Sequence, residues 1–171
     1  MRKMAVIFVA LACWSSLVWS QGVHERFVGT WELDRIETQT ESGAWTLAKT
    51  RWGSQPIGIL TYDSAGNMAV QIMRRDRTPL SSAGLAEGQS VNSEALALAP
   101  VEEKAAAFDG YTAYFGKYSV REVEGVITHQ RIGHLVPNQA TLSVERHFEF
   151  LDDALVLAVP GGIRLVWNPA N

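Results

Sequence analysis

Residues 111–134 constrain the fold of this chain more than any other segment of the sequence. They predict two antiparallel strands, residues 112–120 and 126–133, joined by a tight turn at Glu124-Gly125. Apolar and aromatic residues alternate imperfectly with polar ones, as is typical of a sheet whose two faces have different surroundings. The same two strands carry Tyr114, His129, Arg131 and His134.

Strand-like segments of similar length recur through the rest of the chain. Segments 58–62 and 67–74, for example, flank a hairpin loop, and segment 163–167 is the last strand. Eight to ten short strands joined mostly by hairpins indicate a mainly β protein, an antiparallel barrel or sandwich. One short helix, residues 100–108, is expected between strands, because Pro100 suits the first helical position.

The N-terminal residues have the composition of a signal peptide. Arg2 and Lys3 precede an apolar run, which is too short for a membrane span. We expect cleavage after Ser20, a single domain over residues 21–171, no membrane span after signal removal, and a secreted or periplasmic location. The segment ending at Cys13 also resembles a lipoprotein processing box, so lipid anchoring is an alternative. Cleavage after Ser20 would remove the only cysteine and exclude disulfides.

The charge balance bears on possible partners. Removing Arg2 and Lys3 from the 15 basic residues leaves 13 against 18 acidic ones, a formal charge of -5. A general nucleic-acid binder needs a basic face to neutralise phosphates, so we expect no nucleic acid partner. The oligomeric state stays open.

Several motifs resemble one protein family. Gly29-Thr30-Trp31 resembles the G-x-W signature of lipocalins, with Arg164 on the last strand as a candidate to stack on Trp31. The longer pieces that support it are residues 58–68, 71–77, 114–118 and 126–129 with Pro137-Asn138. Together they resemble the bacterial and fungal lipocalin-like domain proteins over about residues 27–167. The resemblance implies a β-barrel whose interior holds a small, mostly apolar ligand. The inserted helix and the lack of disulfides depart from typical secreted lipocalins.

The candidate ligand-binding residues lie on three strands. His129 and Arg131 share one face of their strand, so both line the cavity or both face solvent. A buried arginine indicates a carboxylate or enolate partner. Gln71 and Met73 share a face with a small alanine, which leaves room for a ligand, although methionine is also ordinary core filler. The full set is Gln71, Met73, Tyr114, His129 and Arg131.

Three functions remain open. The leading hypothesis is a binding protein for a small hydrophobic molecule, with residues 81–93 and the following helix beside the mouth of the barrel. The alternative is an isomerase or cyclase with His129 and Tyr114 as its acid–base pair. A third possibility is an interaction domain whose barrel is filled by side chains. Histidines 129, 134 and 147 match no metal-ligand spacing, so we expect no metal, and no cofactor motif appears.

Overall fold

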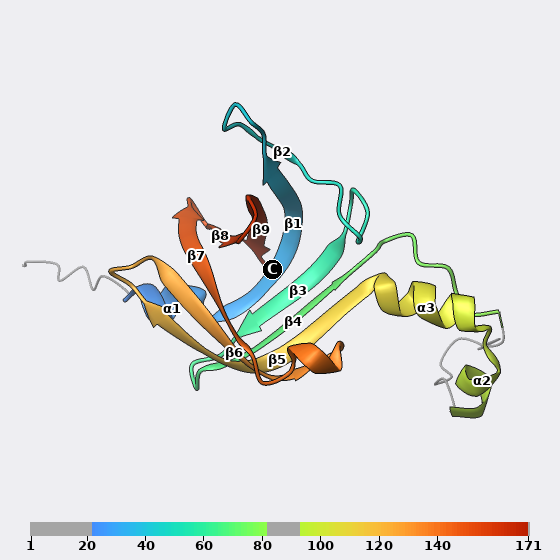
Figure 1. Ribbon diagram of the computed structural model, residues 1–171. Coiled ribbons are helices and arrows are strands. Elements are labelled where there is room, and N and C mark those ends of the chain that lie inside the picture. Colours follow the sequence, from blue (N-terminus) through green and yellow to red (C-terminus); the bar gives the residue numbers. More distant parts are fainter. Residues whose placement is uncertain (1–21, 82–92, 171) are drawn as a thin grey trace, which may run out of the picture.

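The computed structural model describes residues 22–81 and 93–170 of the chain, and in this part nine strands form one antiparallel sheet. The strands are β1 (Gly29–Gln39), β2 (Trp45–Leu47), β3 (Ile57–Tyr62), β4 (Asn67–Met73), β5 (Tyr111–Arg121), β6 (Val126–His134), β7 (Ser143–Leu151), β8 (Ala154–Val159) and β9 (Ile163–Pro169). Each strand pairs with its neighbour in the order β2-β1-β3-β4-β5-β6-β7-β8-β9, and β9 also pairs with β1. That pairing closes eight strands into a barrel (Figure 1), so the predicted fold class is confirmed.

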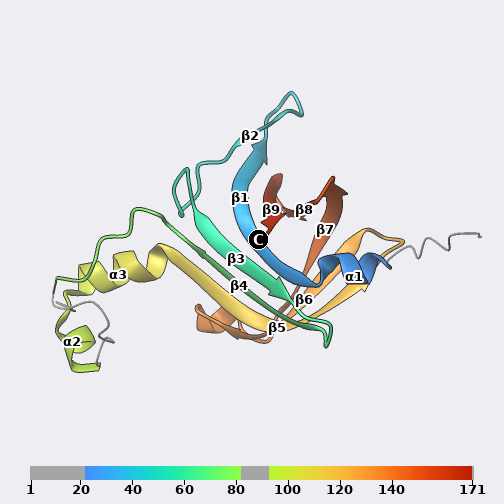
Figure 2. The ribbon, with the colours of Figure 1, turned by 180° about the vertical axis from the view of Figure 1, so that it is seen from behind.

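The helices lie outside the barrel wall. They are α1 (Val23–Phe27), α2 (Ser93–Leu98), α3 (Val101–Asp109) and the 3-10 turn η1 (Pro137–Gln139). Helix α3 matches the expected helix and follows Pro100, but α2 precedes it, so two short helices rather than one stand between β4 and β5. Both project from the side of the barrel opposite α1 (Figures 1 and 2).

One end of the barrel is closed by α1. Phe27, the last residue of this helix, is fully buried and packs edge-on against Tyr62, Phe148 and Phe150, with ring centroids 4.9–5.6 Å apart. The Trp31 Nε1 donates to the Phe27 carbonyl oxygen at 2.9 Å. Burying such aromatic area is strongly stabilising, so the G-x-W segment fixes the helix that covers this end.

A β-bulge determines which residues of β6 face inward. Gly116 of β5 pairs with Arg131, whereas the preceding Phe115 pairs with Gly133, so Ile132 is an extra residue. A bulge shifts the alternation by one position, so His134 points to the same side of the sheet as Arg131. Gly116 permits this close approach, because a Cβ there would overlap the Gln130 carbonyl oxygen.

The expected stacking of Arg164 on Trp31 is wrong. Trp31 is buried in the core, whereas Arg164 lies on the outer face of β9, where it is paired with Glu37 of β1. Its guanidinium lies over Trp45 instead, 4.2 Å from the ring centroid. Trp31 and Arg164 lie on opposite faces of the neighbouring strands β1 and β9, so their side chains cannot stack.

Residues 1–21 lie outside the described part of the chain, and with them the expected signal peptide, its cleavage site and Cys13. Across residues 22–81 and 93–170, no helix has both the length and the apolar character needed to cross a membrane.

Candidate functional site

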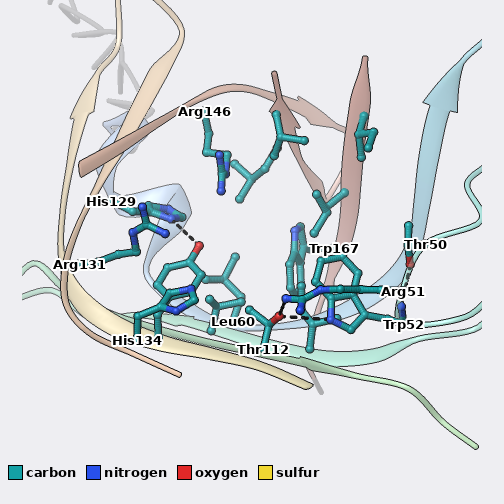
Figure 3. Close-up of a pocket in the computed structure, with 17 residues that line it drawn as sticks. Thr50, Arg51, Trp52, Leu60, Thr112, His129, Arg131, His134, Arg146 and Trp167 are labelled. Carbon is teal, nitrogen blue, oxygen red and sulfur yellow. Dashed lines mark hydrogen bonds between the residues drawn. The ribbon is translucent and has the colours of Figure 1, made fainter. Parts of the chain in front are cut away.

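The barrel encloses a cavity of about 290 Å³. Its wall is largely apolar, formed by inward-facing side chains of β3, β4, β8 and β9: Leu60, Val70, Ile72, Leu157, Leu165 and Trp167. Polar side chains form two clusters in the cavity lining (Figure 3). His129, Arg131 and Arg146 lie on one side of the view, and Arg51, Trp52 and Thr112 lie on the other. No described residue of α2 or α3 lines the cavity, and the β2–β3 connection contributes residues 50–52. Residues 82–92, which were also expected beside the mouth, lie outside the described part of the chain.

A hydrogen-bonded chain, Tyr62–His129–Tyr114, crosses the inner face of three strands. The Tyr62 hydroxyl lies 2.7 Å from His129 Nε2, and the Tyr114 hydroxyl lies 3.1 Å from His129 Nδ1. His129 is 1% exposed, so its ring is isolated from bulk water. Alternation along β6 places the imidazole inside the barrel, as the sequence allowed.

All three members of this chain are neutral at physiological pH. Burial lowers the pKa of His129 to about 3, and the positive charges of Arg146 and Arg131 act in the same direction. Burial also raises the pKa of Tyr62 well above its usual value. It raises the pKa of Tyr114 too, although Arg146 and Arg131 oppose that shift.

Neutrality fixes which atoms donate. In the described part of the chain, His129 is the one side chain that the fully buried Tyr62 hydroxyl contacts by a hydrogen bond. A buried hydroxyl needs an acceptor for its proton, so Tyr62 donates to Nε2 and the neutral ring carries its proton on Nδ1. Nδ1–H then donates to the Tyr114 oxygen. The Tyr114 O–H is therefore left to donate to an acceptor in the cavity.

Arg131 is a buried cation with neutral partners. It is 8% exposed, and its Nε donates to the Leu142 carbonyl oxygen at 3.1 Å, while Nη1 donates to Gln139 Oε1 at 3.0 Å. Burial lowers the pKa of its guanidinium, but arginine stays protonated. Its charge centre lies 5.8 Å from the centroid of the Tyr114 ring, and the same ring stacks with His134 at a centroid distance of 5.4 Å.

Arg51 belongs to the second polar cluster of the cavity lining. Its guanidinium lies 4.9 Å from the centroid of the Trp52 ring and donates to the Thr112 hydroxyl. Trp52 Nε1 donates to the same hydroxyl oxygen at 3.3 Å. These contacts tie the β2–β3 connection to β5 and hold an arginine at the edge of the cavity.

Three of the five predicted site residues meet in this cavity and two do not. Tyr114, His129 and Arg131 line it together. Gln71 and Met73 face outward, because they alternate with the inward-facing Val70 and Ile72, so their predicted position in the cavity is wrong. They line a separate shallow groove outside the barrel, where the Tyr111 hydroxyl donates to Gln71 Oε1 at 3.2 Å.

The three histidines considered as metal ligands are not brought together. His129 and His134 line the cavity, but His147 is exposed on the outer face of β7. Among the residues that the structure describes, no three His, Cys, Asp or Glu side chains form a group able to hold a metal ion.

The sequence-based set omitted Tyr62 and Arg146. Arg146 occupies an inward register position of β7 that Val144, Phe148 and Phe150 otherwise fill with apolar side chains. A single arginine on an apolar strand face was the signal that could have identified it. Tyr62 carried a weaker signal, because a tyrosine on an inward face is ordinary core material.

The fold is thus a closed antiparallel barrel that is covered at one end by a helix and encloses a partly apolar cavity. The family model described as lipocalin-like domain matches residues 28–168 of the sequence. The chain belongs to the lipocalin-like domain family. No curated protein matches the sequence.

Proposed function

We propose that this protein binds a small, mostly apolar molecule inside the barrel. The observation that carries the proposal is the cavity of about 290 Å³, enclosed by apolar side chains. Protein interiors are normally packed as densely as organic crystals, so a void of this size costs stability unless a ligand fills it. It also disfavours the third hypothesis, an interaction domain with a filled barrel.

The polar groups of the cavity would orient the ligand. Tyr114 offers a hydroxyl proton that its neighbours leave free, and Arg131 offers guanidinium protons. Pockets of this kind gain affinity from apolar walls and orientation from a few placed polar groups. The ligand is therefore an apolar molecule that carries at least one oxygen acceptor.

The first test is a titration with N-phenyl-1-naphthylamine, a neutral apolar dye that fluoresces in dry surroundings. Trp167 lines the cavity, so energy transfer from tryptophan reports binding there. Val70→Phe should fill the cavity and weaken dye binding by about tenfold or more. Ala69→Phe adds the same ring on the outer face of the same strand, and should leave dye binding unchanged.

Absence of dye binding by the folded wild-type protein would contradict the proposal, and so would an unchanged affinity of Val70→Phe. If the dye binds as expected, mass spectrometry of organic extracts from natively purified protein identifies the natural ligand. The extract of Val70→Phe serves as the matched blank.

An isomerase or cyclase is the second candidate, and the observation in its favour is the convergence of His129 and Tyr114 on one cavity. Its weakness is electrostatic. Efficient acid–base catalysis needs a pKa near the working pH, whereas the pKa of His129 is lowered to about 3 and that of Tyr114 is raised. Both His129 nitrogens are also occupied by tyrosine hydroxyls, so a substrate proton could reach the ring only through Tyr114.

Hydrogen exchange separates the two candidates. The enzyme hypothesis predicts that the wild-type protein accelerates exchange of the α-hydrogens of 2-tetralone in D₂O, and that Tyr114→Phe abolishes this. The binding hypothesis predicts the uncatalysed rate for both proteins, measured by proton NMR.

We further propose a secreted or periplasmic location, supported by the signal-peptide composition of residues 1–20. Expression of the full chain in a secreting host should yield a mature N-terminus at Gln21 by intact-mass analysis. A lipidated N-terminal Cys13 would establish the alternative, and an uncleaved chain would contradict both.

A further inference from the structure

The cations of the cavity have no matching anions. Three arginines line the cavity, Arg51, Arg131 and Arg146, yet no lining residue is Asp or Glu. Within the described part of the chain, none of the three lies within 4.0 Å of a carboxylate, although Arg35, Arg74, Arg121 and Arg164 each do. Arg131 is the buried one of the three, and a buried charge is normally paired because removing it from water is costly.

Arg131 has N–H groups that its described contacts do not use. A guanidinium carries five N–H groups, and the two contacts of Arg131, through Nε and Nη1, use two of them. Those contacts fix the plane of the group by holding it to Leu142 and Gln139. The remaining N–H groups belong to a cation that is already desolvated and oriented, which lowers the cost of ordering it around an anion.

Arg146 adds a second cation on the neighbouring strand. It pairs with Ile127 across β6 and β7, two positions from His129, and its side chain points into the cavity (Figure 3). Its Nη1 donates to the neighbouring Glu145 carbonyl oxygen over a long distance, 3.5 Å, and a side-chain hydrogen bond between Arg146 and Tyr114 acts to lower the pKa of that hydroxyl. This arginine is therefore available to a ligand.

Tyr114 lies close to both cations, since the charges of Arg146 and Arg131 both act to lower its pKa. Its hydroxyl proton points to the cavity because His129 Nδ1–H occupies its oxygen. Two guanidinium groups and a hydroxyl donor thus line the same cavity. Charge-assisted hydrogen bonds from such groups to an oxyanion are about twice as strong as neutral ones.

From this geometry we propose that the cavity holds its ligand by a carboxylate, bound by Arg131 and Arg146 with the Tyr114 hydroxyl as an added donor. The remainder of the ligand is apolar and lies against Leu60, Val70 and Leu157. The ligand class is thus an apolar carboxylic acid. This inference rests on the proposed binding function and adds the chemistry of the ligand's polar group.

The test compares decanoate with 1-decanol at neutral pH, as competitors that displace N-phenyl-1-naphthylamine. The two molecules share an alkyl chain and differ in the carboxylate. Decanoate should displace the dye at a concentration about tenfold or more below that of 1-decanol, since each charge-assisted hydrogen bond contributes more than a neutral one.

Arg146→Gln should abolish the advantage of decanoate, taken as the ratio of the 1-decanol and decanoate concentrations that displace the dye from the same variant, so that any change in dye affinity cancels. The matched control is Arg121→Gln, which removes one positive charge from an exposed arginine paired with Glu124 and Glu145, outside the cavity lining. It should keep the full advantage of decanoate. Arg131→Gln should behave as Arg146→Gln does, with circular dichroism to establish that it folds.

Each result has a distinct meaning. If the dye binds and decanoate displaces it no better than 1-decanol, the carboxylate site is wrong while the proposed binding function stands. An undiminished advantage in Arg146→Gln, or an equal loss in Arg121→Gln, overturns the inference as well. If the dye does not bind the folded protein, the proposed function itself fails.

Discussion

The two faces of the barrel wall hold arginine in opposite ways. On the outside, Arg164 Nε lies 2.6 Å from Glu37 Oε2 and Arg35 Nε lies 2.9 Å from Glu37 Oε1. On the inside, Arg131 and Arg146 have neutral contacts in the described structure. Among the described residues, arginine is therefore neutralised by a carboxylate on the outer face and has no carboxylate partner on the inner face.

Because of this difference, we expect the outer arginines to affect the stability of the fold and the inner arginines to affect ligand binding. A paired outer arginine contributes to the fold, and loss of its partner leaves a half-buried charge uncompensated. An uncompensated inner arginine does not stabilise the empty barrel. In the carboxylate site that we propose, its role is pre-organised binding of an anion. Variants on the two faces should accordingly move stability and binding separately.

The largest expected effect is on the outer face. Glu37→Gln should lower the free energy of unfolding by about 2 kcal/mol, because the Glu37 and Arg164 side chains are only 12% and 16% exposed. Urea denaturation measures this. Glu149→Gln is the control: Glu149 is 53% exposed and 3.4 Å from Arg164, so it should cost less than about 0.5 kcal/mol. Equal effects of the two variants would show that the outer pairing does not stabilise the fold.

Acid should reveal the buried histidine with an effect of about the same size. The pKa of His129 is lowered to about 3 in the folded protein, so between that value and the unfolded pKa of about 6.5 the unfolded state binds the extra proton. Stability therefore falls as pH falls through this window. The wild type should lose about 2 kcal/mol more than His129→Gln between about pH 7 and pH 5. Parallel pH profiles of the two proteins, by urea denaturation, would contradict the burial of a neutral imidazole.

Arg146→Gln should have a smaller effect on stability. Without ligand it should change the free energy of unfolding by less than about 1 kcal/mol, or increase it, since it removes an uncompensated charge. Arg146 is also one of the two charges that lower the pKa of His129, so its loss should raise that pKa and make the acid profile shallower. A marked destabilisation of the ligand-free protein would mean that Arg146 has a structural role.

The smallest effect is expected in the outer groove. Gln71→Ala and Met73→Ala change side chains on the outer face of β4, away from the cavity. Each should leave the affinity for N-phenyl-1-naphthylamine within about twofold of wild type. A large loss of dye binding would place the dye in the outer groove rather than in the barrel.

The sequence predicted the antiparallel strands and hairpins because hairpins are local and their turns depend on short motifs. The β5–β6 hairpin was located with its turn at Gly125, whose positive φ of 63° suits glycine. The pairing of β9 with β1 joins the two ends of the sheet. It was inferred through the family resemblance, since no local pattern encodes it.

The faces of the strands were harder to predict than the strands themselves. On β6, alternation places His129 and Arg131 on the same face of the strand, without saying which face that is. The structure shows that both side chains face the interior. On β4 both alternating sets contain apolar residues, so the set with Gln71 and Met73 could not be told from the inward set of Val70 and Ile72. The inward position of His134 depends on the bulge at Ile132, a tertiary feature without a sequence signal of its own.

A crystal structure of the protein with decanoate is the most direct test of whether the barrel interior binds an apolar acid by its carboxylate. We expect the carboxylate within hydrogen-bond distance of Arg131 and Arg146, with the alkyl chain along the apolar wall beside Val70. Decanoate bound elsewhere on the protein, or bound inside with its carboxylate turned away from both arginines, would contradict it.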